Sequence, residues 1–186
     1  MADISVTTPS KSRATAAIER VAPASEPCWD LIELLFFAYR DFVGDPDEVL
    51  AKLEFGRAHH RVLHFVNRNP GMKVAELLDV LKITKQSLGR VLKQLIDDGY
   101  IVQREGEHDR RQRLLYVTPA GQALAMQLAG LQTARIATVL AELGPGGHEA
   151  ARRFLAGMIN AGDRDQVLRM IAHADRANRR SRDGAS

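Results

Sequence analysis

The sequence predicts a mainly α-helical protein with a small two- to three-stranded β wing, and three observations carry this prediction. Apolar residues recur at three- and four-residue spacing over most of the chain, which is the period of one helix face. Strand-like apolar segments occur around residues 101–117, on either side of a charged turn. Two short helical segments joined by a tight link precede that turn. This order of elements predicts a winged helix-turn-helix with further helices before and after it.

Composition limits the class of protein. The 186 residues correspond to about one to one and a half domains, and 45% of them are apolar, so a sizeable core is expected. The formal net charge is only +3, so total charge does not by itself indicate nucleic acid. A single cysteine, Cys28, excludes a disulfide within the chain and fits a reducing cytoplasm. We expect neither a signal peptide nor a membrane span, because no apolar stretch of the required length is present.

The chain begins with a polar arm followed by a strongly apolar helix. Residues 1–25 are rich in Ser, Thr, Ala and Pro and are expected to form a flexible arm. A helix is predicted from Pro27 to Val43, where apolar residues fall on nearly every face. Such a helix is buried on most sides, and in so small a chain we expect a second copy to cover it. The GDPDE segment at Gly44–Glu48 is predicted to end this helix.

The next three helices have the spacing of a helix-turn-helix preceded by a supporting helix. The first follows Gly56 and ends at Asn69–Gly71, where proline and glycine disfavour a helix. A short helix comes next, and the link Lys82–Thr84 leads into the third. Thr84 is predicted to cap this third helix, because its hydroxyl can accept an N–H of the first turn. The apolar face of the third helix consists of Leu88, Val91, Leu92, Leu95 and Ile96.

The exposed start of this third helix carries side chains suited to duplex DNA. An α-helix fits the major groove, and residues early on the helix and away from its apolar face can reach the base edges. No acidic residue occurs from Leu81 to Ile96, so nothing in that segment repels phosphate. An ordinary solvated helix face is the alternative interpretation. The predicted DNA contacts on this helix are Thr84, Lys85, Gln86, Ser87 and Arg90.

The predicted strands enclose a charged hairpin tip with the sequence REGEHDRR. Asp109 lies two residues before Arg111, and its carboxylate is expected to orient that guanidinium into a narrow minor groove, whose negative potential attracts arginine. Glu105 and Glu107 weaken the local positive field, so we expect the tip to act by placement of individual side chains. A solubilising hairpin tip is the alternative. The phosphate contacts predicted here are Arg104, Arg110 and Arg113.

Further helices are predicted after the hairpin. Thr118 and Pro119 begin the first, because threonine caps a helix and proline at its first position gives up an N–H that has no partner there. This helix extends to about Leu143 and ends at a GPGG segment. Another covers roughly His148–Asn160, and a last helix is predicted to begin at Asp163 and to lead into a basic tail.

Several of these motifs together resemble those of the MarR family of transcriptional regulators. The resemblance is strong from about Phe55 to Leu128. It is carried by the segment KVAELLDVLKITKQSLGRVLKQLIDDGYIV, by the DRR at Asp109–Arg111 and by the TPAG at Thr118–Gly121. The segment FGRAHHRVLHFVNRNPG is similar to the PetP-like branch of the family.

The resemblance implies a homodimer with a helical dimerisation domain. Each protomer would present one recognition helix to a pseudo-palindromic site with half-sites about 10 bp apart. A repressor that is released by a small effector is the implied mode of action. The implied organisation is a flexible arm (1–25), a dimerisation helix and linker (26–56), the winged helix-turn-helix (57–118), C-terminal dimerisation helices (119–175) and a basic flexible tail (176–186).

Some residues are candidates for a sensing role. Phe36, Tyr39, His60 and His64 are predicted to line an effector pocket, with burial in a dimer core and ordinary structural histidines as the alternatives. The two histidines have the four-residue spacing of zinc ligands, but no Cys, Asp or Glu lies between Arg57 and Lys73, so no metal site is predicted. A metal-responsive regulator stays an alternative, and Cys28 keeps a redox-responsive one open.

Motifs of catalysis and cofactor binding are missing from the sequence. It contains no G-x-S-x-G, H-E-x-x-H, P-loop or glycine-rich nucleotide fingerprint, so we expect neither enzymatic activity nor a cofactor. A winged helix that binds another protein is the main alternative to DNA binding. Salt separates the two, because counterion release makes DNA binding weaken steeply as salt increases.

Overall fold

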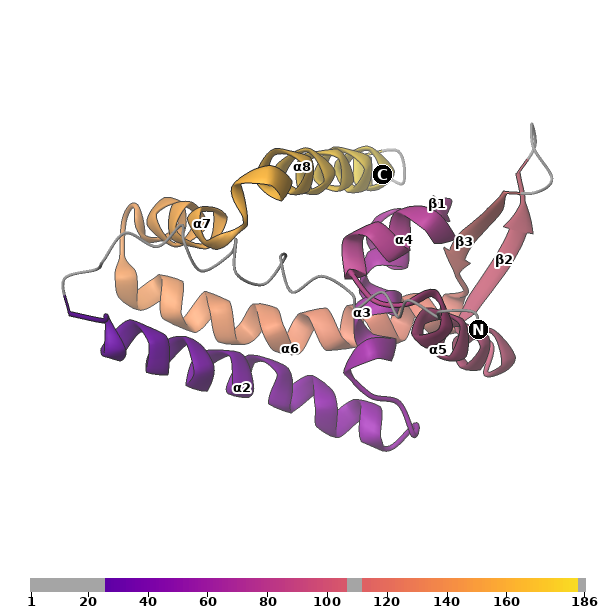
Figure 1. Cartoon of the computed structure of the whole chain (residues 1–186), viewed down its shortest axis with the longest axis horizontal. Helices are drawn as coiled ribbons and strands as arrows, with labels where there is room; N and C mark the ends of the chain where they lie inside the picture. Colours follow the sequence, from indigo (N-terminus) through magenta and orange to yellow (C-terminus); the bar gives the residue numbers. More distant parts are fainter. Residues whose placement is uncertain (1–25, 107–111, 184–186) are drawn as a thin grey trace, which may run out of the picture. The chain divides into compact units, whose positions relative to one another are not determined.

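The computed structural model describes residues 26–106 and 112–183, so the predicted flexible arm, residues 1–25, lies outside the described residues. The described chain is mainly helical with one three-stranded antiparallel sheet, as predicted. Backbone contacts divide the chain into two units, residues 1–38 and 39–186, and the boundary falls inside the first helix below. The elements of Figure 1 are α2 (Trp29–Ala51), α3 (Arg57–Arg68), β1 (Met72–Lys73), α4 (Val74–Leu81), α5 (Lys85–Asp97), β2 (Ile101–Glu105), β3 (Arg113–Val117), α6 (Pro119–Leu143), α7 (Gly147–Met158) and α8 (Ala161–Asp183).

The sheet ties the wing to the helix-turn-helix. Its strand order is β1-β3-β2, and all pairs are antiparallel. The strands of the predicted hairpin, β2 and β3, pair with Ile101 opposite Val117 and Glu105 opposite Arg113. The short strand β1 pairs with the other edge of β3, where Met72 lies opposite Leu115. Because β1 leads directly into α4, the hairpin and the first helix of the motif are held on one sheet.

One hydrophobic core joins α3, α4, α5, the sheet and the start of α6. α5 contributes Leu88, Leu92 and Leu95, which belong to its predicted apolar face, and all three are buried. Val91 and Ile96 of the same face are partly buried against this core. Since apolar burial is the main favourable term in folding, this packing fixes which face of α5 points outward. The other fully buried side chains of the core include Leu50, Leu63, Leu77, Ile101, Leu115 and Leu128.

α2 does not end where the sequence predicts. The GDPDE segment at Gly44–Glu48 is predicted to stop the helix, but the helix continues to Ala51 with Pro46 inside it. A proline inside a helix removes one hydrogen bond and usually kinks or ends the helix. Here Val43, Pro46 and Leu50 are all buried. The prediction was wrong because burial of this face outweighs the local preference.

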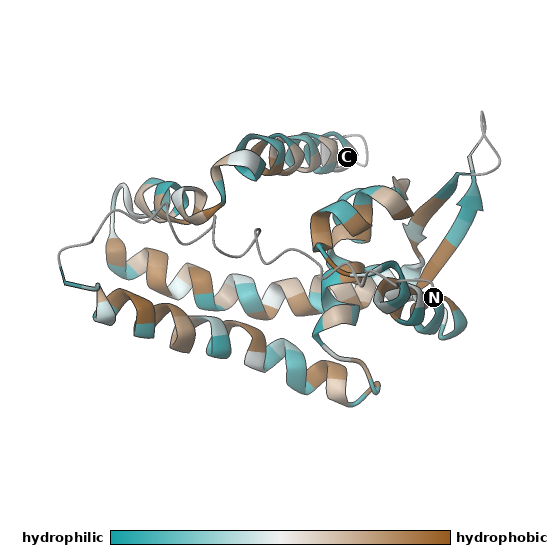
Figure 2. Ribbon diagram, viewed as in Figure 1, coloured by the Kyte–Doolittle hydropathy of each residue, from teal (hydrophilic) through white to brown (hydrophobic). Residues whose placement is uncertain are grey.

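The first half of α2 exposes large apolar side chains in the single chain. Trp29 is 63% exposed and Phe36 is 69% exposed. Figure 2 shows hydrophobic residues on successive turns of this segment. The sequence predicts that a second copy covers them, and that stays a prediction.

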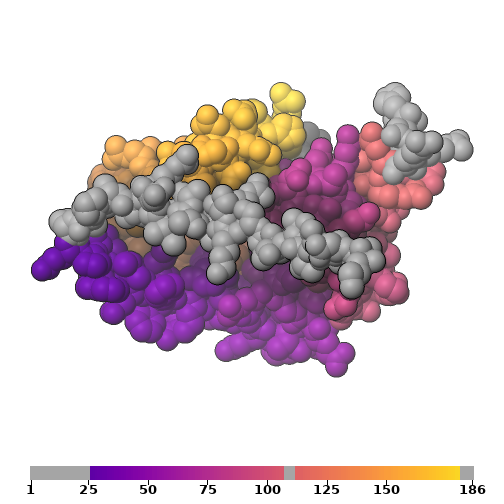
Figure 3. Space-filling model, viewed as in Figure 1, coloured from indigo at the N-terminus to yellow at the C-terminus, as the bar shows by residue number. Residues whose placement is uncertain are grey.

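α8 is longer than predicted and packs against the helix-turn-helix. It extends to Asp183, past residue 176, where the sequence predicts the start of a flexible tail. Ala174 is buried, and Met170 packs against the main core. Arg68 at the end of α3 donates a hydrogen bond to Asp175. In the space-filling view α8, in yellow, lies against the magenta surface of α4 (Figure 3). Among the described helices, none is long and apolar enough to cross a membrane.

Candidate nucleic-acid interface

The residues predicted to contact DNA on α5 form one exposed surface, which we call the recognition face. It consists of Thr84, Lys85, Gln86, Ser87 and Arg90, and each of these residues is exposed. Burial of Leu88, Leu92 and Leu95 on the other side of the helix holds this face outward. The structure therefore places all five of them where a partner can reach them.

The start of α5 is fixed by a cap that also belongs to the recognition face. Thr84 is the N-cap, as predicted, and its Oγ1 accepts a hydrogen bond from the Ser87 N–H at 3.1 Å. The Thr84 hydroxyl donates to Ser87 Oγ at 2.9 Å. Ser87 Oγ therefore keeps its own proton, which it can donate to a phosphate or a base.

Two more residues of α5, Gly89 and Lys93, share the exposed side, and Lys93 was missed by sequence reasoning. Gly89 and Lys93 lie three residues after Gln86 and Arg90, so they continue the same stripe. A Cβ atom added at Gly89 would meet no atom within 4 Å. The Lys93 ammonium forms an ion pair with Asp97 on the next turn. The helical spacing was the signal that would have found Lys93.

The link between α4 and α5 is held by contacts from two other helices. Arg61 of α3 donates a hydrogen bond to the backbone carbonyl of Leu81 at 3.0 Å. Lys82 adopts the left-handed conformation, with φ 52°, at a position where glycine is usual. Its ammonium lies 3.5 Å from a carboxylate oxygen of Asp163 on α8. The entry into the recognition face is thus set from α3 and α8 as well as from its own sequence.

A histidine connects the start of α3 to α5. His59 stacks on Phe55 with ring centres 4.8 Å apart, and its Nδ1 accepts the Gly56 N–H at 3.1 Å. Its Nε2 lies 2.9 Å from the side-chain oxygen of Gln94. Because Nδ1 acts as the acceptor, the ring proton of the neutral imidazole is assigned to Nε2, which donates to Gln94. This pair braces the second half of α5 against α3.

The two wing arginines that the structure describes, Arg104 and Arg113, have different partners. Arg113 on β3 forms an ion pair with Glu105 on β2 at 2.8 Å, so its charge is partly offset. The Arg104 guanidinium lies 4.9 Å from the ring centre of Tyr116, which supports its planar group by a cation–π contact. The Gly106 N–H donates to the Gln112 carbonyl at 3.1 Å. Asp109, Arg110 and Arg111, the predicted tip contacts, lie outside the described residues.

The residues predicted to line an effector pocket occupy α2 and α3. The guanidinium of Arg57 lies 5.9 Å from the ring centre of Tyr39 and is held by an ion pair with Asp47 at 2.8 Å. Burial lowers the pKa of His60, and the charge of Asp47 opposes that shift. Phe36 belongs to the first unit and is exposed. An effector role for Phe36, Tyr39, His60 and His64 stays a prediction.

His64 has a lowered pKa as well. Partial loss of solvent around the ring is the largest cause, and the positive charges of His60 and Arg68 add to it, although the side chain stays exposed. Within residues 26–106 and 112–183 no three His, Cys, Asp or Glu side chains gather as a metal site would need. Cys28 is exposed and free.

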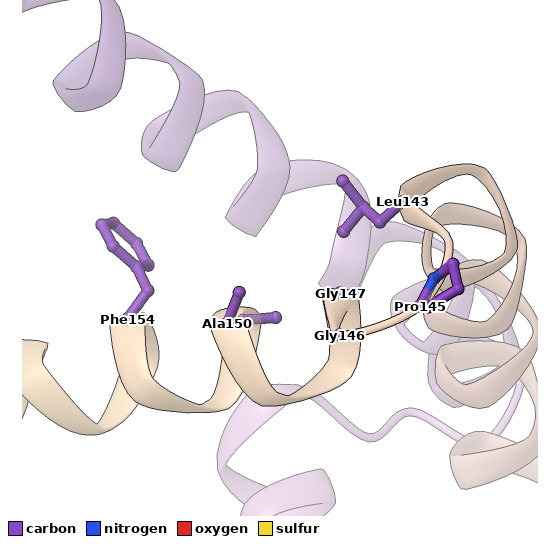
Figure 4. Close-up of a pocket in the computed structure, with 7 residues that line it drawn as sticks. Leu143, Pro145, Gly146, Gly147, Ala150 and Phe154 are labelled. Atoms are coloured by element: carbon purple, nitrogen blue, oxygen red, sulfur yellow. The ribbon is translucent and has the colours of Figure 1, made fainter.

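An apolar hollow lies at the turn between α6 and α7. Its volume is about 570 Å³ (Figure 4). Phe154, which borders it, is 50% exposed, and Leu143 is 56% exposed. None of the side chains around it is charged, so it is suited to apolar contacts and not to binding an ion. The hollow is lined by Leu143, Pro145, Gly146, Gly147, Ala150, Ala151 and Phe154.

Comparison with known proteins gives a family match and a curated relative. The model of the MarR family matches residues 54–112 of the chain. The HTH-type transcriptional regulator PetP of Rhodobacter capsulatus is 45% identical over 129 residues, which cover 69% of this chain and 78% of that protein. Both matches are to regulators of transcription and not to enzymes.

Solved structures with the same fold include two protein–DNA complexes. Streptococcus pneumoniae FabT in complex with DNA has a TM-score of 0.63 at 15% identity, covering 71% of this chain and 94% of that one. A protein from Listeria monocytogenes complexed with 26mer DNA has a TM-score of 0.62 at 19% identity, covering 78% of this chain and 93% of that one. At such low identity these likenesses establish the fold alone.

Proposed function

The chain belongs to the MarR family of helix-turn-helix transcriptional regulators, and on that premise we propose that it binds double-stranded DNA sequence-specifically as a homodimer. The observation that carries the proposal is the recognition face of α5. It is exposed and lacks carboxylates, and the contacts of Thr84 and Arg61 hold its entry in place. A helix presented in this way fits the major groove.

The wing supplies the second part of the proposed interface. Arg104 is exposed, with its guanidinium supported by Tyr116, so it can reach a phosphate without losing side-chain order. The tip arginines Arg110 and Arg111, oriented by Asp109, are proposed to contact phosphate and the minor groove. Arg113 is proposed to act more weakly, because its pair with Glu105 must break or rearrange before it can bind phosphate.

Exposed apolar surface supports the homodimer. On α6 and α7 four large apolar side chains are at least half exposed, namely Val139, Leu143, Phe154 and Leu155. Of these, Leu143 and Phe154 line the hollow of Figure 4. The first half of α2 adds Trp29 and its apolar neighbours. Exposed apolar surface of this kind on a folded chain marks an interaction site. A symmetric pair would present two recognition faces to half-sites about 10 bp apart.

The proposed mode of action is repression. A dimer seated on a pseudo-palindromic operator occludes the promoter, and a small effector releases it by favouring a state in which the two recognition faces no longer match the half-site spacing. Since its proposed partner is DNA, the proposed place of action is the cytoplasm.

Selection from a random duplex library tests the proposal. We expect an inverted repeat to be enriched, and we expect log K to fall with log salt by about 0.9 per phosphate contact. Recovery of no ordered site, or a nearly flat salt dependence, would contradict DNA binding and favour a protein-binding winged helix.

Two variants test the assigned surface. Arg90→Ala should weaken operator binding by about tenfold or more while the thermal midpoint of unfolding stays unchanged, because Arg90 is exposed. Arg152→Ala is the matched control, since it removes an exposed arginine from α7. If both variants bind the operator with equal affinity, Arg90 is not part of the DNA interface. Sedimentation should give a dimer, and a monomer that binds the operator at full affinity would overturn the homodimer.

A further inference from the structure

A cavity of about 930 Å³ lies between α8 and the helix-turn-helix. The end of α3, the turn into β1, and α4 form one wall, while the end of α7 and α8 form the other. Known small-molecule sites have volumes of about 300–1,000 Å³, so this cavity has the size of a ligand site. The predicted effector-pocket residues Tyr39, His60 and His64 do not line it.

The walls of the cavity are mainly apolar and adaptable. Three of the five methionines of the chain, Met72, Met158 and Met170, contribute to the lining. Methionine is flexible and polarizable, and it is favoured at surfaces that fit apolar ligands of varied shape. Phe65, Val80 and Val167 are among the other apolar residues of the walls.

Three charged groups of the lining are held by contacts within the protein, whereas Asp79 of α4 is an exposed carboxylate that also lines the cavity. Arg68 is paired with Asp175, and Lys82 is paired with Asp163. Glu76 accepts the backbone N–H of Lys73 at 2.8 Å. An anionic ligand would be repelled by Asp79 and would have to displace Asp175 or Asp163 from its basic partner, whereas an uncharged ligand leaves all three contacts in place. The lining therefore favours a neutral ligand over an anionic one.

We propose that this cavity binds an uncharged, mainly apolar organic molecule. The ligand lies between Met170 on α8 and Met72 on the opposite wall, with Met158 at the end of α7 closing it. Apolar burial against these walls supplies the affinity, and the amide groups of Asn69, Asn160 and Gln166 are the polar groups within reach of a carbonyl or hydroxyl on the ligand.

Binding at this place acts on the entry to the recognition face. Lys82 lines the cavity and belongs to the link before Thr84, and its partner Asp163 belongs to α8. Exposed ion pairs of this kind are weak, so a ligand wedged under α8 can change the contact between them. This effect on DNA rests on the proposed function, whereas ligand binding does not.

Fluorescence titration of the full chain without DNA tests the proposal. The probe is N-phenyl-1-naphthylamine, an uncharged apolar dye that brightens in apolar sites. We expect saturable binding of one probe per chain. Met170→Trp fills the cavity and should weaken probe binding by about tenfold or more. Ile171→Trp, the matched control, puts the same bulk on the exposed side of α8 and should bind the probe as the wild type does.

Met170 also packs against the core, so Met170→Trp could lose probe binding by misfolding. A second variant distinguishes a filled cavity from a misfolded chain. Met158 lines the cavity but is 57% exposed, so Met158→Trp should fold normally and still weaken probe binding. Absence of saturable binding, full binding by both cavity variants, or an equal loss in Ile171→Trp would overturn the proposal. Operator binding, measured with and without the probe, tests the effect of the ligand on DNA binding. A chain that binds the probe but no DNA would disprove the proposed function and leave the ligand site intact.

Discussion

Gly121 at the start of α6 packs directly against the backbone of Tyr100: a Cβ atom added at Gly121 would lie 2.0 Å from the Tyr100 carbonyl oxygen. The same carbonyl accepts the N–H of Thr118 at 3.0 Å. The Thr118 hydroxyl caps Gly121 N at 3.0 Å and donates to the Gly99 carbonyl at 2.7 Å. The Thr-Pro-Ala-Gly motif therefore fastens α6 to the segment that joins α5 to β2.

Gly121→Ala should destabilise the protein. The added methyl group meets backbone and not a flexible side chain, so the expected loss is about 1–3 kcal/mol or more of unfolding free energy. Urea unfolding measures it. Gly130→Ala is the control, because a Cβ at Gly130 on the same helix meets nothing within 4 Å. That change should be neutral or stabilising, and equal losses in both variants would show that the Tyr100 contact is not decisive.

Thr84→Ala should cost about 1 kcal/mol of unfolding free energy, because the Ser87 N–H loses its acceptor. Thr84→Ser keeps a hydroxyl and should retain most of the stability. Chemical denaturation of the two variants side by side measures the difference. If serine and alanine were equally destabilising, the methyl group of Thr84 and not its hydroxyl would be the important part.

Gly89→Ala should raise stability and lower DNA affinity together. Alanine favours a helix interior by about 0.8–1 kcal/mol over glycine, and the site is exposed with no neighbour in the way. The methyl group would stand on the proposed DNA-facing stripe beside Arg90. Urea unfolding and operator binding measure the two effects. Unchanged affinity would mean that the duplex does not approach α5 at Gly89.

Acid should destabilise the fold partly through His60. Burial lowers the pKa of His60 in the folded chain, while in the unfolded chain it is near the ordinary value of about 6.5. Below that pH the unfolded state binds more protons, so this stabilising contribution is complete above about pH 6.5 and is lost as pH falls through the folded pKa. Unfolding free energies at pH 8, 6.5 and 5.5 should decline in that order.

The variant His60→Gln should make the decline with pH shallower. It should not abolish the decline, because the pKa of His64 is lowered too, and protonation of His64 also favours the unfolded state. A wild-type unfolding free energy that is flat between pH 8 and 5.5 would contradict this account.

Much of the winged helix-turn-helix could be predicted because its signals are local. The Thr84 cap depends on a hydroxyl three residues before Ser87, and the outward direction of Arg90 depends on the apolar period of α5. Thr118 and Pro119 begin α6 for equally local reasons. Each of these can be read within one turn of helix.

What could not be predicted depends on contacts between distant segments. Pro46 stays inside α2 because its face is buried, and no neighbouring residue signals that. Lys82 meets Asp163 across a separation of 81 residues, and Arg68 meets Asp175 across 107. α8 passes residue 176 as a helix, although its arginine-rich composition equally suits a solvated tail.

The exposed apolar first half of α2 carries a consequence for how much of this regulator a cell must make. If the proposed homodimer covers this surface, a newly synthesised single chain is prone to aggregate before it dimerises, since Trp29 and Phe36 face water. At low cellular concentration, monomeric chains would be lost to aggregation or proteolysis. The thermal midpoint of unfolding would rise with protein concentration, because dimerisation stabilises the folded chain. Abundance would therefore set a threshold for occupancy of the operator, independent of any signal molecule.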